Sequence, residues 1–159
     1  MGIAIDYQDY CYDYFRLRYY YKEQFWILTF LQRPDDQFHD QFSALLSKHW
    51  HLSCCKNGLI DLRDISFVNH DEAFGDIVNF TITKLDAQRK YVVLCNTPLE
   101  TALFYLVKRK AQEHNMTFNL FSTMDAALAY LNIHADALSI DIDLNDIKKM
   151  STASIRPQY

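Results

Sequence analysis

The sequence predicts an α/β protein with a single mostly parallel sheet, an N-terminal β-hairpin and four helices. Short apolar segments that fit the period of a strand alternate with longer segments that fit the period of a helix. Helix caps and turn residues separate these segments by short connections. Alternation of this kind is typical of parallel strands joined by right-handed helical crossovers. The predicted order is strand, strand, helix, strand, helix, strand, helix, strand, helix.

The first two predicted strands are rich in tyrosine. Residues 14–21 alternate between apolar side chains at odd positions and a mixed set at even positions, which predicts a strand with one apolar face. KEQ at 22–24 is the expected hairpin loop, and FWILTFL at 25–31 predicts a second, more buried strand. Because aromatic residues favour strands, we interpret this tyrosine-rich segment as an exposed edge strand, with a binding surface as the alternative.

Four amphipathic helices follow, each with a recognisable start. Asp35 or Asp36 is the expected cap of the first, and Asn69 and Glu72 stand close to the spacing of a capping box at the second. TPLE at 97–100 gives the third helix a cap, a first-turn proline and an acid, and Ser122 or Thr123 caps the fourth. The stripes expected to face the sheet are Phe38, Phe42, Leu45, Leu46 and His49; Phe74, Ile77, Val78, Ile82 and Leu85; Leu99, Leu103, Leu106 and Val107; and Met124, Ala127, Leu128 and Leu131.

Three further strands complete the sheet, at residues 57–64, 90–96 and 118–121. KYVVLCN at 90–96 is nearly all apolar, as expected for a strand that is covered on both faces. We therefore expect residues 1–134 to form one domain, followed by a tail at 135–159 that has a short helix near residues 144–150.

Composition limits the classes of partner. A chain of 159 residues is the size of one domain, and its net charge of −4 provides no basic field for a nucleic acid. The first residues lack a basic leader, and no apolar run approaches the length of about 18 residues that spans a membrane. The four cysteines do not have the spacing of a disulfide scaffold, so we expect reduced thiols in a cytoplasmic protein.

The sequence contains no familiar catalytic or metal-binding signature. With three glycines, the chain has neither a P-loop nor a dinucleotide-binding fingerprint, and it contains no G-x-S-x-G motif. HWHLSCC at 49–55 holds ligand types for zinc or copper, but in no familiar spacing. DIDLND at 141–146 resembles the start of a calcium loop but lacks its glycine and its final glutamate. We expect no enzymatic activity, no cofactor and no metal.

Polar residues at the carboxyl ends of predicted parallel strands are the best candidates for a site, because open α/β sheets bind ligands at this edge. Asp61 and Arg63 at the end of one strand are expected to pair with each other and anchor the loop, and the alternative is that they orient a polar ligand or hold a partner helix. His70 is either a contact residue or a tolerated first-turn residue of the next helix. The candidate partner- or ligand-binding residues are Asp61, Arg63, Asp64, Asn69, His70 and Thr97.

Three segments together resemble a known family. GLIDLRDISFV followed by a helix, RKYVVLCNTPLETALFYLVKRKA, and FNLFSTMDAALAYL are similar to the SpoIIAA-like group, relatives of the STAS (anti-sigma-factor antagonist) domains. The recurring elements are a strand ending in Asp-Leu-Arg, a strand followed by a capped helix, and a terminal element matched by Phe121, Thr123, Ala127, Tyr130 and Leu131. The resemblance covers residues 14–133 and implies the fold more strongly than an activity.

The resemblance also implies a role in docking a protein partner, and this chain differs from the family at the phosphorylated serine. True antagonists carry a phosphorylatable serine at the start of the helix after the Asp-Leu strand, where this chain has Asn69, His70 and Asp71, with Ser66 upstream. We therefore expect a docking role without control by serine phosphorylation.

The leading hypothesis is a non-enzymatic, cytoplasmic protein-interaction or regulatory module that binds an unidentified protein. The alternative is a carrier of a small apolar ligand or lipid, because the STAS architecture is similar to that of lipid-carrying SEC14 domains and aromatic residues are abundant here. A homodimer is a further expectation, since an exposed edge strand tends to be covered, either by the tail or by a second copy.

Overall fold

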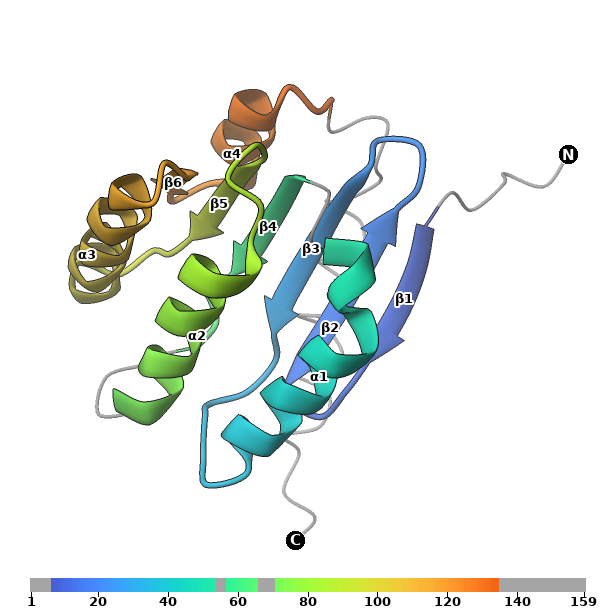
Figure 1. The fold of residues 1–159 in the computed structure, drawn as a ribbon, viewed down its shortest axis with the longest axis vertical. Coiled ribbons are helices and arrows are strands. Elements are labelled where there is room, and N and C mark those ends of the chain that lie inside the picture. The colour runs from blue at the N-terminus through green and yellow to red at the C-terminus, as the bar shows by residue number, and fades with distance from the viewer. Residues whose placement is uncertain (1–6, 54–56, 66–70, 135–159) are drawn as a thin grey trace, which may run out of the picture.

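The computed structural model describes residues 7–53, 57–65 and 71–134, which form one mixed sheet and four helices (Figure 1). The α/β class expected from the sequence is confirmed. The strands are β1 (Tyr7–Cys11), β2 (Phe15–Tyr20), β3 (Phe25–Phe30), β4 (Asn57–Asp61), β5 (Lys90–Leu94) and β6 (Thr117–Phe121). The helices are α1 (Phe38–Ser53), α2 (Asp71–Lys84), α3 (Pro98–Glu113) and α4 (Met124–Leu131).

The six strands are ordered in space as they are along the chain, from β1 to β6. β1, β2 and β3 pair antiparallel, whereas β3, β4, β5 and β6 pair parallel. The sequence predicted two strands before the first helix, and β1 is a third. As a result β2, which was expected at the sheet edge, lies between β1 and β3. The prediction missed β1 because its five residues are half-buried or exposed and show no apolar face.

The two faces of the sheet carry separate apolar clusters. α1, α2 and α3 cover one face, where Phe15, Phe30, Phe38 and Phe42 pack together and the rings of Phe15 and Phe30 meet edge to face at 4.9 Å. α4 covers the opposite face through Met124, Ala127, Leu128 and Leu131, together with side chains of β3, β4 and β5. The helices are therefore distributed unequally, with three on one side of the sheet and one on the other.

A close approach between β3 and β4 requires a glycine. Trp26 is 1% exposed and lies opposite Gly58 in the parallel register of these strands. A Cβ atom at Gly58 would stand only 2.1 Å from Cζ2 of the Trp26 ring. The indole thus occupies the space that any other side chain at position 58 would need.

The predicted stripes of α1 and α4 are confirmed, because their expected contact residues are buried or pack against the core. The stripe predicted for α3 is wrong in half of its members. Val107 is buried as expected and Leu103 is half-buried, but Leu99 and Leu106 are 53% and 58% exposed, and Glu100, Phe104 and Ala111 face the core instead. The true stripe is displaced by one residue, or about 100° around the helix. It escaped the prediction because it begins with a glutamate.

Several expectations concern residues outside the described ranges. These are the tail at 135–159 with its short helix and calcium-like segment, and the cap at Asn69. In the part of the chain that the structure describes, no helix is both long enough and apolar enough to cross a membrane.

Candidate functional site

Asp61 and Arg63 form an internal ion pair at the carboxyl end of β4. Asp61 is 4% exposed, and its two carboxylate oxygens accept from Arg63 Nε at 2.9 Å and Arg63 Nη2 at 2.8 Å. The backbone N–H of Arg63 also donates to Asp61 at 3.2 Å. This bidentate geometry compensates the buried carboxylate and fixes the turn that leaves the strand. The structure therefore confirms the intramolecular pairing that the sequence favoured.

The other candidate residues after β4 are not brought into this pair. Asp64 is exposed to solvent beside it. Asn69 and His70 lie outside the described residues.

Thr97 is the N-cap of α3 and follows the carboxyl end of the neighbouring strand β5. Its side chain accepts from the backbone N–H of Glu100 at 3.3 Å and donates to Glu100 Oε2 at 2.8 Å. Pro98 then occupies the first turn, where no N–H is required. Glu100 is 1% exposed, and its Oε1 is buried without a hydrogen-bond partner. The sequence correctly predicted this cap but not the burial of its carboxylate.

Cys95, two residues before Thr97, is a buried thiol. It is 2% exposed, and its Sγ lies 3.6 Å from Thr101 Oγ1. Burial raises the pKa of the Cys95 thiol, so the thiolate that would act as a nucleophile is disfavoured at neutral pH.

The solvent side of α3 carries an apolar surface that continues from this edge. We define the outer face of α3 as Leu99, Ala102, Tyr105, Leu106, Arg109 and Lys110, all of which are exposed. Among the described residues, five large hydrophobic side chains are exposed, and three of them belong to this face: Leu99, Tyr105 and Leu106. Tyr105 is 53% exposed, as is Leu99. The sequence held a signal for this surface: α3 has two apolar stripes, and the sheet needs only one.

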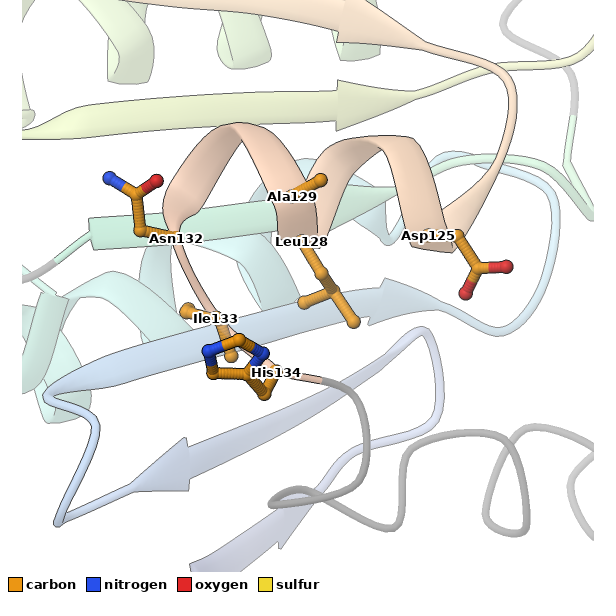
Figure 2. A pocket seen from close by; sticks show the side chains of 6 residues that line it. All are labelled: Asp125, Leu128, Ala129, Asn132, Ile133 and His134. Atoms are coloured by element: carbon orange, nitrogen blue, oxygen red, sulfur yellow. The ribbon is translucent and has the colours of Figure 1, made fainter.

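A pocket of about 420 Å³ lies beside α4 (Figure 2). Leu128 and Ile133 supply apolar surface, and polar groups come from both ends of the helix. The residues that line it are Asp125, Leu128, Ala129, Asn132, Ile133 and His134.

A second pocket, between the sheet, α1 and α2, is much smaller. Its volume is about 20 Å³, and Trp26, Leu45 and Phe80 are among the side chains that line it. A space of this size holds about one water molecule rather than a lipid chain.

The histidines and thiols do not assemble into a metal centre in the described part of the chain, where no group of three or more ligating side chains is placed to hold an ion. His49 is buried instead, with Nε2 hydrogen-bonded to the hydroxyl of Tyr12 and its ring 4.2 Å from that of Tyr10. The other histidine and the vicinal cysteines of HWHLSCC lie outside the described side chains.

Comparison with known proteins gives no match to a protein-family model, a curated protein or a solved structure.

Proposed function

We propose that this protein is a non-enzymatic, cytoplasmic interaction module that docks a protein partner on the outer face of α3. The neighbouring edge with Asp64 and Thr97 completes this surface. The observation that carries the proposal is the exposure of Leu99 and Leu106, at 53% and 58%, on a helix whose opposite side is fully packed.

An apolar surface of this kind has a thermodynamic cost that a partner would remove. A helix that only shields a sheet needs one apolar stripe and is normally polar elsewhere. Burying a fully exposed leucine contributes about 1.5–3 kcal/mol, so these two side chains, which are little more than half exposed, offer roughly half of that each. Contiguous exposed apolar residues on a soluble domain typically mark an interaction site.

The resemblance to the SpoIIAA-like group supports the same role. Helices and strands alternate from β3 to α4 within residues 14–133, where the resemblance was drawn. The Asp-Leu-Arg segment fixes the turn after β4 through the ion pair between Asp61 and Arg63. A rigid turn beside an exposed apolar helix is suited to binding a folded partner with little loss of conformational freedom.

Affinity capture with matched variants tests the proposal. The double variant Leu99→Ser/Leu106→Ser removes the apolar contact, whereas Leu31→Ser changes a leucine that is 38% exposed elsewhere. We expect a partner that binds the wild type and Leu31→Ser with equal affinity and loses at least about tenfold with the double variant, which corresponds to about 1.4 kcal/mol. Equal binding by all three proteins would show that the outer face of α3 is the wrong surface.

A second function, binding of a small ligand, is favoured by the pocket beside α4. Its volume of about 420 Å³ falls within the usual range for small-molecule sites. Asp125, Asn132 and His134 line it together with Leu128, so the ligand would carry a polar group as well as an apolar part. Native mass spectrometry of the purified chain tests this: we expect a co-purifying mass that is lost in Ala129→Asp, which changes an exposed residue of the pocket lining. A clean apo spectrum from several expression hosts would argue against it.

A further inference from the structure

The outer face of α3 carries an excess of positive charge in its last turns. Arg109 and Lys110 are exposed in its last turns, and Lys108 beside them donates to Asn119 Oδ1 at 2.8 Å. The carboxylate in the first turn, Glu100, points into the protein and does not offset these charges on the surface, and the exposed Glu113 at the end of the helix offsets them only in part. The whole chain carries a net charge of −4, so this local cationic end runs against its overall balance.

A second copy of this chain does not complement this surface. Two antiparallel α3 helices would place Arg109 and Lys110 of one copy beside the first turn of the other, which is the positive pole of that helix. The acid of that first turn is Glu100, which is 1% exposed and cannot pair with them. Parallel packing would bring the two cationic ends together, which is also unfavourable.

An anionic membrane is also a poor fit. Recognition of such a surface takes clusters of about four to eight cations. The outer face of α3 has two exposed cations, on a chain whose net charge of −4 would be repelled by the same membrane. The charges therefore favour an acidic protein over an acidic lipid layer.

Building on the docking role proposed above, we propose that the partner presents an acidic amphipathic helix that packs antiparallel to α3. Its aliphatic residues lie on Leu99 and Leu106, and acidic side chains in its first turn face Arg109 and Lys110. Antiparallel packing satisfies both helices, because acids at an N-terminus also stabilise the partner helix against its own dipole. Leu99 and Lys110 lie about three turns apart, so a partner helix of three to four turns covers the face.

Two synthetic peptides of about 18 residues, each with leucines at helical spacing, test this partner chemistry. One carries glutamates in its first turn and the other carries lysines at the same positions. Fluorescence anisotropy of each labelled peptide gives its affinity for the full chain and for its variants. We expect the glutamate peptide to bind more tightly than the lysine peptide.

The variants separate the two parts of the surface. For the glutamate peptide we expect Arg109→Gln/Lys110→Gln to weaken binding about fivefold at low salt and less at about 1 M salt, where charges are screened within about 3 Å. Leu99→Ser/Leu106→Ser weakens binding at both salt concentrations. The controls Arg89→Gln and Leu31→Ser, which change an exposed cation and an exposed leucine elsewhere, leave it unchanged.

Three results would overturn the inference. The first is binding of the lysine peptide that equals or exceeds that of the glutamate peptide, and the second is binding of anionic phosphatidylserine vesicles without binding of the glutamate peptide. The third is a dimer of the chain that the double variant Leu99→Ser/Leu106→Ser dissociates. Its failure is distinguishable from failure of the docking role itself. A captured protein that requires Leu99 and Leu106 but tolerates loss of Arg109 and Lys110 leaves the interaction function standing and removes the acidic helix.

Discussion

Replacing Gly58 by alanine is expected to destabilise the fold strongly. The added Cβ would lie 2.1 Å from Cζ2 and 2.2 Å from Cε2 of Trp26, against a normal carbon contact of about 3.5–4.0 Å. The ring cannot move freely, because Trp26 is 1% exposed and packs against Tyr91 with centroids 6.2 Å apart. Overpacking of a core costs about 1–3 kcal/mol, and the atoms in conflict here are rigid, so we expect a loss of about 3 kcal/mol.

Urea denaturation followed by circular dichroism measures this loss, and Gly75→Ala is its matched control. Gly75 is exposed within α2, and a Cβ there meets no atom within 4 Å. An alanine in an exposed helix interior is preferred over glycine by about 1 kcal/mol, so the same substitution should stabilise the protein at Gly75. The pair therefore predicts changes of opposite sign.

The double variant Gly58→Ala/Trp26→Leu tests the cause. If the clash with the indole is responsible, the two substitutions together should cost less than the sum of their separate effects. A Gly58→Ala protein as stable as the wild type, or strictly additive losses in the double variant, would refute the steric argument.

Three further predictions concern single side chains. Thr97→Ala should lower the free energy of unfolding by about 1 kcal/mol, because its hydroxyl caps the first turn of α3; urea denaturation measures this. Asp9→Asn should cost about 2 kcal/mol by the same measurement, because it removes the charge that faces Arg18 at 2.6 Å, and the Arg18 side chain is only 6% exposed. A hydrogen bond to Asp35 raises the pKa of Tyr14 from 10.0 to about 12. The folded state therefore favours the neutral phenol of Tyr14. This contribution to stability is complete below pH 10 and is lost as the pH rises toward 12. The stability advantage of the wild type over Tyr14→Phe should shrink across this interval, as urea denaturation at several pH values measures.

Helices with one apolar stripe were predictable from the sequence, and the helix with two was not. α1 and α4 each present a single set of apolar residues at helical spacing, so their buried sides were fixed by the pattern. α3 offers two sets that are one residue apart. Its orientation is decided by tertiary contacts, including the burial of Glu100 beside Thr97 and the edge-to-face contact of Phe104 with Phe74 at 5.5 Å.

β1 shows a different limit of sequence reasoning. Its residues lack an apolar face, and what holds it in the sheet is pairing with β2, in which Asp9 lies opposite Arg18 and Tyr7 opposite Tyr20. The Arg18 guanidinium also lies over the Tyr7 ring at 3.9 Å. Contacts of this kind depend on the partner strand, so a local pattern cannot reveal them.

The candidate site was predictable in its position but only in part in its chemistry. The strand pattern placed Asp61 and Thr97 at the carboxyl edge, and both lie there. The sequence favoured the pairing of Arg63 with Asp61 over a ligand contact, and the structure shows this pair, but the pattern did not predict its bidentate geometry. The exposure of Leu99 was hidden by the wrong orientation of α3, which is why the main docking surface emerged only from the structure.

The mixed pairing of the sheet has a consequence for the order in which the chain acquires structure. β1, β2 and β3 join through tight reversals, so their pairs form between residues that are neighbours in sequence. In contrast, Asn57 pairs with Phe25 across a connection that contains the whole of α1, and each later parallel pair is also joined by a connection that contains a helix. Pairs that are so far apart in sequence form more slowly. As the ribosome releases the chain from its N-terminus, we expect the meander to emerge first and to persist only once α1 is available to shield Phe15 and Phe30.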